Sequence, residues 1–255
     1  MRSLRNATGR SAAGGESAPT GPPLVWPTSP AQLIAAQELL AGASPPSWRP
    51  GSDERAIGAC VVCFARGQTG PGARGDRAWA AAAVLRGGRI LSEACVAGRA
   101  GAPYAPGLLA LREGPCLEAA VLAAELLPDV LLVDATARDH PRRAGLALQL
   151  GAVLDLPTVG VTHRPLLSQG PFPDDVRGAT SPLLLDQEPV GAWLRTCRGA
   201  RPLAIHPGWR TDLDVAVEVA VIASQAHRTP DPLRHARMLA RTARARSVQS
   251  RERSE

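Results

Sequence analysis

The sequence contains no lysine, and aromatic residues make up only 3% of its 255 positions. All 29 of its lysine-type and arginine-type charges are therefore arginines, in a chain that is also rich in alanine, glycine and proline. This composition is typical of GC-rich coding, so the net charge of +6 and the pI of about 9.9 indicate a polyanionic partner only weakly. Because aromatic residues are scarce, we expect each one to have a specific role.

Long apolar runs are also missing. No stretch is long enough to cross a bilayer. Residues 1–23 carry positive charges but lack the apolar centre of a secretory signal. We therefore expect a cytoplasmic protein that has no membrane partner.

Complete cysteine motifs are absent as well. The chain has five cysteines, and only Cys60 and Cys63 form a C-x-x-C pair. This pair lies in an apolar segment that predicts a buried strand, and no second pair or nearby histidines complete a zinc site. We favour reduced thiols in the core over a metal site.

The chain divides into three segments by composition. Residues 1–30 are rich in Gly, Ser, Ala and Pro without periodicity, which predicts disorder. Residues 31–245 are predicted to form one folded domain, and residues 246–255 a basic disordered tail. A short amphipathic helix is expected at the start of the domain, with Ser29 as its N-cap and Pro30 in its first turn.

The first half of the domain predicts an antiparallel meander followed by parallel strands. Three strand candidates come first, and Gly87-Gly88 joins the last two as a tight hairpin. A strand at 129–134, a helix at 140–156 and a strand at 157–163 form a βαβ unit, in which Pro141 is placed for the first helical turn. The three strand candidates of the meander are 55–65, 78–86 and 89–97.

The second half adds short strands at one side of the sheet and ends in two helices. The last helix is basic and amphipathic. A meander followed by a β-α-β-α layer is the order of a ribonuclease H-like mixed sheet, so we predict an α/β fold of that class with flanking helices. These elements are expected at 181–186, 190–196 and 201–207 for the strands, and at 211–227 and 230–253 for the helices.

Two carboxylates are candidates for catalysis. Asp134 ends an apolar strand, where ligands collect in α/β sheets, but it is also a plausible N-cap for the next turn. Glu113 is spaced from Leu109 and Leu117 so that it faces the sheet, although a capping role on the helix dipole is the alternative. Pro115 predicts that the regular helix starts near this point. If the two carboxylates converge, they suit Mg²⁺ or Mn²⁺.

A cluster of basic side chains follows Asp134. His140, Arg142 and Arg143 are predicted to lie at a helix N-terminus, which attracts phosphate. The alternative is a surface charge cluster. Proximity to Asp134 favours the phosphate role.

Three sequence blocks resemble successive signatures of the endonuclease V family. They are residues 103–115, 129–161 and 202–220, and the resemblance runs from about Arg55 to His227. It implies a ribonuclease H-like fold and a Mg²⁺-dependent nuclease that cuts one phosphodiester bond 3′ of a deaminated base, chiefly hypoxanthine (inosine).

The resemblance gives the "PYAPG" stretch a role. In the family this loop is a wedge that separates the strands at the lesion, and it matches Pro103, Tyr104, Pro106 and Gly107. The prolines fix the loop before nucleic acid binds, so that Tyr104 can stack where the flipped base was.

The family's remaining functional positions are matched in part. Glu113 and Asp134 match family metal ligands, and His140 matches the histidine before the arginines. Three arginines lie close to these residues in the sequence and are expected to bind nucleic acid: Arg112, Arg142 and Arg143.

Three positions depart from the family pattern. Cys60 stands at the position of a catalytic aspartate, and a thiol is a poor ligand for Mg²⁺. His163 replaces a lysine, and Trp209 replaces a late histidine, with His206 three residues earlier. Candidate replacements for the missing polar groups are Asp76, Asp212 and Asp214.

These observations predict a monomeric nuclease that acts on inosine-containing DNA or RNA. Glu113 and Asp134 would hold Mg²⁺ or Mn²⁺, and His140 and His163 would assist in phosphate binding or proton transfer. The alternative is an inactive family member that only binds deaminated or distorted nucleic acid. The substituted metal site favours this alternative, and the intact wedge is compatible with both.

Overall fold

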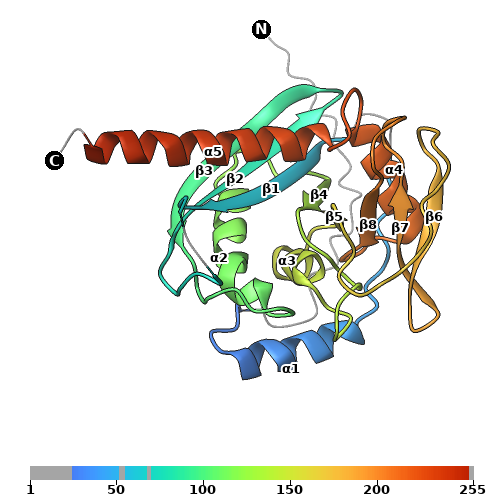
Figure 1. Ribbon diagram of the computed structural model, residues 1–255, viewed down its shortest axis with the longest axis horizontal. Coiled ribbons are helices and arrows are strands. Elements are labelled where there is room, and N and C mark those ends of the chain that lie inside the picture. Colours follow the sequence, from blue (N-terminus) through green and yellow to red (C-terminus); the bar gives the residue numbers. More distant parts are fainter. Residues whose placement is uncertain (1–24, 52–54, 68–69, 253–255) are drawn as a thin grey trace, which may run out of the picture.

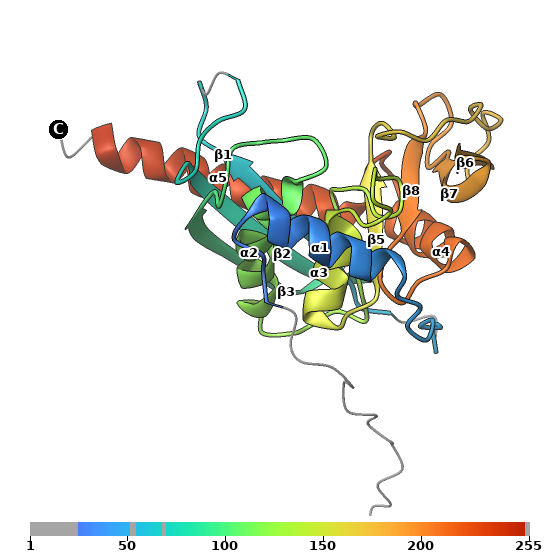
Figure 2. The ribbon, with the colours of Figure 1, turned by 90° about the horizontal axis from the view of Figure 1, so that it is seen from below.

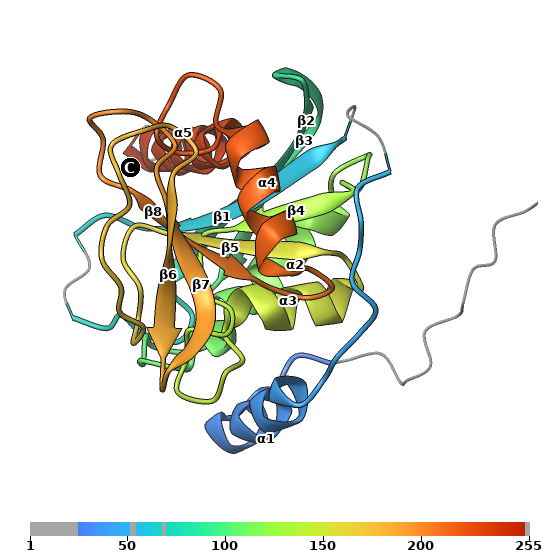
Figure 3. The same ribbon diagram turned by 90° about the vertical axis from the view of Figure 1, so that its right-hand side faces the viewer.

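The computed structural model describes residues 25–51, 55–67 and 70–252. An eight-stranded mixed sheet forms the middle of the fold, with the strand order β3-β2-β1-β4-β5-β8-β7-β6. Helices cover both of its faces (Figures 1 and 3). The predicted α/β fold with a ribonuclease H-like mixed sheet is confirmed. Among the described residues, no helix is long and apolar enough to cross a membrane.

The meander forms as predicted. β1 (Ile57–Phe64), β2 (Arg77–Arg86) and β3 (Arg89–Arg99) pair in antiparallel order. Gly87 and Gly88 have φ angles of 54° and 83°, a left-handed pair that only a residue without Cβ adopts readily. The double glycine therefore fixes the hairpin.

The βαβ unit is also present. β4 (Val130–Val133) pairs in parallel with β1 on one side and with β5 (Thr158–Thr162) on the other. The connecting helix α3 (Leu146–Leu154) packs beneath them. Because these strands are parallel, their carboxyl ends share one edge of the sheet, and Asp134 lies at that edge.

The remaining three strands lie at one side of the sheet, as predicted. β8 (Leu203–Pro207) pairs antiparallel with β5, and β7 (Glu188–Leu194) and β6 (Thr180–Leu185) follow it. Their antiparallel order means that the parallel part of the sheet consists of β1, β4 and β5.

Two apolar cores hold the layers together. α2 (Leu109–Leu122) and α3 bury one core against the sheet, and α1 (Pro30–Ala41) lies outside them (Figures 2 and 3). α4 (Leu213–Ala223) and α5 (Asp231–Glu252) bury the second core on the opposite face. α5 is the longest helix and crosses β1 and β2 (Figure 1).

Two helix starts were predicted wrongly. α2 begins at Leu109, so Pro115 lies inside it and not in its first turn. Pro115 has no N–H, so the carbonyl of Leu111 lacks its helical donor. This carbonyl oxygen lies 2.2 Å from the position that a Cβ would occupy on Gly101. The close approach of a glycine backbone accommodates the freed carbonyl.

The second wrong start concerns α3, which begins at Leu146 and not near Pro141. Arg143 has a φ of 54°, which is incompatible with a right-handed helix, and the amide of Gly145 donates to the carbonyl of Ala137. Residues 140–145 therefore form a turn. His140, Arg142 and Arg143 do not lie at a helix N-terminus.

Segment boundaries also differ at the two ends. Trp26 donates to Glu118 on α2 and Ser29 caps α1, so residues 25–30 are packed on the domain. α5 continues to Glu252, so the predicted disordered tail is helical from 246 to 252. The predicted disorder of 1–24 lies outside the described residues.

The cysteines are free thiols. Cys60 and Cys116 are buried, as expected for core residues, whereas Cys63 and Cys197 are half-buried and Cys95 is exposed. Side chains alternate between the two faces of β1, so Cys60 and Cys63 point to opposite faces, and only Cys60 is fully buried.

Candidate active site

The carboxyl end of the parallel strands opens into a cavity of about 310 Å³. β1 and β4 are in register with Cys60 opposite Val133, which places Cys60 beside the residue that precedes Asp134. α2 supplies Glu113 from above this edge. The cavity lining is Cys60, Val61, Val62, Tyr104, Leu109, Glu113, Leu117 and Asp134. The structure therefore brings together the two predicted metal ligands, the tyrosine of the wedge loop, and Cys60, which departs from the family pattern.

Glu113 is in an environment that opposes its ionisation. Burial, followed by the negative charge of Asp134, raises the pKa of its carboxyl to about 7, while Arg112 acts in the opposite direction. Two carboxylates thus share a partly desolvated cavity in which their charges repel each other. A cation between them would relieve this repulsion.

Cys60 is fully buried next to the carboxylates. Burial is the main cause that raises the pKa of its thiol, and the charges of Asp134 and Glu113 add to it. The group therefore stays a neutral thiol at physiological pH. A neutral, soft sulfur does not serve as a ligand for a hard cation.

The carboxylate of Asp134 has a partner that the sequence did not reveal. The guanidinium Nη2 of Arg237 on α5 lies 2.7 Å from Asp134 Oδ2. The two residues are 103 positions apart, so no local pattern predicts this pair. The arginine-rich character of the last helix was the only available signal.

The carboxylate pair fits a divalent cation that takes few protein ligands. Within the described ranges, no group of three His, Cys, Asp or Glu side chains is placed to hold a metal. Mg²⁺ is commonly held by one or two carboxylates, with water and substrate phosphate as its other ligands. Glu113 and Asp134 meet that requirement, and the repulsion that adds to burial in raising the pKa of Glu113 favours it.

The wedge loop is fixed at its base by one carbonyl. The oxygen of Gly107 accepts hydrogen bonds from Gln37 Nε2 (3.1 Å), His140 Nε2 (3.1 Å) and Arg142 Nη2 (2.9 Å). Gln37, which is buried on α1, also accepts from Arg142 Nε at 2.6 Å. Sequence reasoning missed Gln37 because its partners lie 70 and 105 positions away.

His140 is therefore an anchor of the loop. Its Nδ1 accepts from the backbone amide of Arg142 at 3.2 Å, so Nε2 carries the proton that is donated to Gly107. Burial is the main cause that lowers the pKa of this histidine. The ring is neutral and both nitrogens are engaged, which leaves no free nitrogen for proton transfer in this arrangement.

The tip of the wedge loop is exposed. Pro103, Tyr104 and Pro106 face solvent, and Tyr104 is 48% exposed. Its backbone amide donates to the carbonyl of Pro71 in the loop between β1 and β2 (2.8 Å), and Figure 2 shows the two loops on the same side of the fold. An exposed aromatic ring on an anchored loop beside the carboxylates is suited to stacking on a base.

Arg112 supports the wedge loop from inside. It is 5% exposed, and its guanidinium binds Asp76 at 3.0 Å and the carbonyl of Ala102 at 2.8 Å. The same group stacks over the ring of Phe64, with 4.1 Å to the ring centroid. The structure places this predicted nucleic-acid contact in the interior, where it ties together the loops on either side of the cavity.

His163 and Arg143 lie on different sides of the site. His163 follows β5, is largely exposed and lies within the electrostatic range of Asp134. The partial burial of its ring, followed by the charges of Arg228 and Arg237, lowers its pKa. Arg143 instead binds Asp186 at 2.9 Å in the turn between β6 and β7. Only His163 of these two is near the carboxylate pair.

The loop that carries His163 is held by a buried carboxylate. Asp139 accepts hydrogen bonds from the backbone amides of residues 166, 167 and 168 at 2.6 to 2.9 Å. Asp139 is fully buried, and these three amides satisfy its carboxylate oxygens. No local pattern distinguishes this residue from its neighbour His140.

The other departing positions lie away from the cavity. Trp209 is at the amino end of β5, where its Nε1 donates to Asp155 at 3.2 Å. His206 is buried on β8, with Nε2 3.1 Å from the hydroxyl of Thr162. The expectation that Trp209 thins the catalytic set is therefore corrected, because it occupies the opposite edge of the sheet from Asp134.

The three candidate replacement carboxylates do not line the cavity either. Asp76 binds Arg112, and Asp212 binds Ser47 (2.6 Å) and Arg49 (2.5 Å) next to α4. Asp214 lies in the first turn of α4, on the far side of the sheet from Glu113. None of them supplies a third ligand from where it stands.

Comparison with known proteins gives this site a family. The family model described as endonuclease V matches residues 52–238. The chain belongs to the endonuclease V family. Among its relatives, endonuclease V of Streptomyces coelicolor is 41% identical over 166 residues, which cover 64% of this chain and 71% of the relative. Endonuclease V of Methanothrix thermoacetophila is 37% identical over 216 residues, which cover 84% of this chain and 92% of the relative.

A solved endonuclease V supports the same assignment at the level of structure. The crystal structure of the Streptomyces avermitilis protein matches with a TM-score of 0.78 and 33% identity, covering 88% of this chain and 96% of the other. The family therefore extends over the sheet, the wedge loop and the carboxylate pair. The predicted resemblance to endonuclease V is confirmed.

Proposed function

We propose that this protein is an endonuclease that cuts a phosphodiester bond 3′ of a deaminated base, chiefly hypoxanthine, in DNA or RNA. One observation carries the proposal: Glu113 and Asp134 face a single cavity whose rim carries the exposed ring of Tyr104. The cavity thus joins a stacking side chain to a pair of oxygen ligands. Family membership supplies the reaction class.

Glu113 and Asp134 are the residues that would hold a divalent cation, Mg²⁺ or Mn²⁺. Such an ion, when bound, supplies charge stabilisation for the phosphate and a more acidic water. Glu113 must be ionised for this role, and its pKa of about 7 places that step near neutral pH. Cys60 contributes no ligand and keeps the floor of the cavity apolar.

Tyr104 would occupy the space that the deaminated base leaves when it flips out. The loop is held at Gly107 by three donors before the substrate arrives, so little conformational entropy is lost when the ring stacks. Base–aromatic stacking stabilises such a complex by about 1–3 kcal/mol. His140 and Arg142 act in this step as positioning residues, because both hold the carbonyl of Gly107.

Basic side chains near the cavity would receive the phosphate. His163 lies close to Asp134, and Arg237 already binds that carboxylate. We assign His163 to phosphate binding or to protonation of the leaving oxygen. The cavity is built within one chain, so we propose that the monomer is the active form.

A role in binding alone is not favoured. The relatives that match this chain are endonucleases. Both carboxylates that match family metal ligands line the cavity. Loss of the third ligand at Cys60 is compatible with cation binding that relies more on water and substrate phosphate.

A nicking assay tests the proposal. Duplexes with and without one hypoxanthine are incubated with the protein across a titration of Mg²⁺ or Mn²⁺, and the same is done with inosine-containing RNA. We expect cleavage of the hypoxanthine strand at a single position, and only with a divalent cation. Cleavage of neither DNA nor RNA at any cation concentration would refute the proposed activity.

A further inference from the structure

α5 carries a row of arginines, of which only Arg237 contacts the candidate active site, through Asp134. Arg234, Arg237 and Arg241 are spaced three and four residues apart, so they share one face of the helix. A groove of about 700 Å³ runs along this face. Its lining is Thr229, Arg234, Arg237, Met238, Arg241, Thr242, Ala245 and Arg246.

The groove starts at the catalytic edge of the sheet. Arg237 lines it and also binds Asp134 at 2.7 Å, so the groove is continuous with the carboxylate of the cavity. Further along, Arg244 donates to the carbonyl of Phe64, the last residue of β1, at 3.1 Å. α5 is therefore fastened across the end of the strand that carries Cys60.

The charge of the groove is positive. No carboxylate belongs to its lining, and Arg241 is exposed without a salt bridge to any carboxylate in the part of the chain that the structure describes. Two threonines, Ala245 and Met238 form the rest of the lining, and all of these side chains are uncharged. An elongated polyanion is the ligand that matches such a surface.

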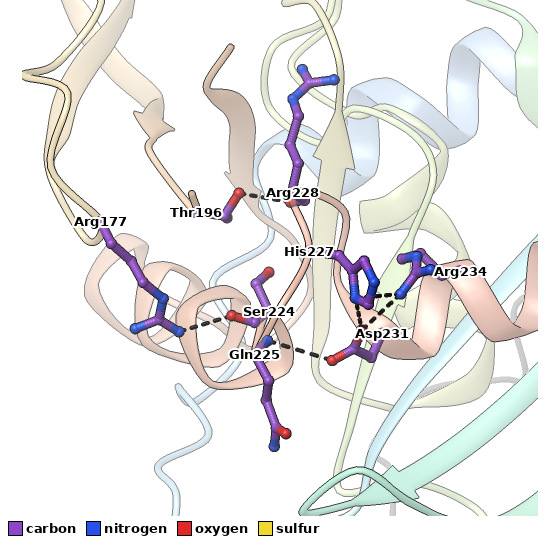
Figure 4. A network of polar contacts seen from close by, with 8 residues as sticks. All are labelled: Arg177, Thr196, Ser224, Gln225, His227, Arg228, Asp231 and Arg234. Carbon is purple, nitrogen blue, oxygen red and sulfur yellow. Dashed lines mark hydrogen bonds and ion pairs between the residues drawn. The ribbon is translucent and has the colours of Figure 1, made fainter. Parts of the chain in front are cut away.

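The first turn of α5 is fixed before any ligand binds. Asp231 accepts from Arg234 at 3.3 Å and from the backbone of Gln225 at 3.4 Å, and His227 contacts the same carboxylate (Figure 4). The hydroxyl of Thr196 donates to the carbonyl of Arg228 at 2.7 Å in the segment that leads into the helix (Figure 4). The arginine row is thus presented on a rigid support.

The spacing of the row suits a nucleic-acid backbone. From Arg234 to Arg241 the helix rises by about 10 Å, at 1.5 Å per residue. One strand of a duplex advances by about 3.4 Å per phosphate, so this length corresponds to about three phosphates. Arg246, five residues after Arg241, also lines the groove.

We propose that the α5 groove binds the phosphodiester backbone of the substrate strand next to the scissile bond. The inference rests on the proposed function for the identity of the strand, and it adds a binding surface outside the wedge and the carboxylate cavity. Contacts of this kind position the strand and carry no information about the base. The groove therefore raises affinity equally for damaged and undamaged nucleic acid.

The test compares two matched double variants of the full chain. Arg241→Gln with Arg246→Gln removes two groove charges, and glutamine keeps the helix propensity of arginine. Arg86→Gln with Arg89→Gln removes two exposed arginines from the β2–β3 hairpin, which lies at the opposite end of the sheet from Asp134. Affinity for duplexes with and without hypoxanthine is measured by fluorescence anisotropy in EDTA, between 50 and 200 mM salt as a working range.

We expect the groove variant to lose roughly 10- to 100-fold in affinity for both duplexes. The slope of log affinity against log salt concentration should become shallower by about 2. The ratio of the two affinities should remain that of the unmodified protein, and the hairpin variant should bind as the unmodified protein does. Equal binding by the groove variant and the hairpin variant would overturn the inference, and so would a loss confined to the hypoxanthine duplex. The circular dichroism spectrum and melting temperature confirm that both variants are folded.

Failure of the proposed function is a separate result. If the unmodified protein cuts no hypoxanthine strand, the activity is refuted, but the groove variant still reports whether α5 holds a nucleic-acid backbone. If the protein cuts and the groove variant binds normally, only the α5 inference is lost.

Discussion

Replacing Glu113 by glutamine removes an ionisation that the fold opposes. The folded protein holds the pKa of this carboxyl at about 7, mainly because of burial, against an ordinary value of 4.5. The difference between these two pKa values corresponds to about 3 kcal/mol of unfavourable free energy for the charged form. Glu113→Gln keeps the size and the hydrogen-bonding character of the side chain but never becomes charged.

The sign of the pH dependence follows from linkage. Below about pH 4.5 the carboxyl is protonated in both states, so its contribution to stability is fully present. As the pH rises to about 7, the unfolded chain loses this proton while the folded protein retains it, and stability falls. Above pH 7 both states are ionised and the loss is complete. The glutamine variant lacks this loss.

Urea unfolding between pH 4.5 and 8 in EDTA measures the effect. We expect the stability of the variant relative to the unmodified protein to increase by about 3 kcal/mol over this range. Glu125→Gln, which changes an exposed glutamate three residues after the end of α2, is the control. Parallel stability profiles for Glu113→Gln and the unmodified protein would refute the proposed environment of Glu113. Added Mg²⁺ should reduce the difference, because it stabilises the ionised folded protein.

Three further predictions concern the floor and the rim of the cavity. Tyr104→Ala should weaken binding to a hypoxanthine duplex by about 1–3 kcal/mol, and an equal loss on undamaged duplex in a binding assay would exclude the wedge role. Cys60→Asp should raise the rate of Mg²⁺-dependent nicking. It should also lower the melting temperature without metal, with partial recovery in Mg²⁺. A folded variant that gains neither nicking activity nor Mg²⁺-dependent stability would show that this position does not face the metal. Gln37→Ala should cost about 1–3 kcal/mol of stability in urea unfolding, since it leaves Arg142 Nε without its acceptor and removes one of the three donors to the Gly107 oxygen. An unchanged midpoint would contradict the anchoring role.

The strands and their order could be predicted because their signals are local. Apolar runs, the Gly87-Gly88 hairpin and the βαβ spacing each define an element within a few residues, and the family resemblance set their arrangement. The convergence of Glu113 and Asp134 followed from the same reasoning, since one faces the sheet and the other ends a parallel strand.

The starts of α2 and α3 could not be predicted from the same signals. Pro115 is a helix breaker by local rules, but a glycine from another loop accommodates the freed carbonyl of Leu111. Pro141 is an ordinary first-turn residue by sequence, yet the left-handed conformation of Arg143 turns the chain before α3 begins. In both cases tertiary contacts override the local preference.

The supporting side chains of the site were the least predictable part. Arg237 reaches Asp134 from 103 positions away, and Gln37 reaches Arg142 from 105 positions away. Arg112 was expected on the nucleic-acid surface because it adjoins Glu113, but consecutive helical residues point in different directions, and Arg112 points to Phe64. Such pairings depend on how the layers pack, and a single sequence carries no periodic signal for them.

The nicking rate of Asp134→Asn is the sharpest test of how the carboxylates and the wedge loop share the reaction. The claim is that the carboxylates at the sheet edge carry the cleavage while the wedge carries recognition. Asparagine keeps the shape and one oxygen of Asp134 but removes the charge that attracts a cation. On a hypoxanthine duplex with saturating Mg²⁺ we predict that nicking by the variant is abolished, while its preference for hypoxanthine over undamaged duplex in EDTA is retained. Nicking by Asp134→Asn at the rate of the unmodified protein would contradict the account.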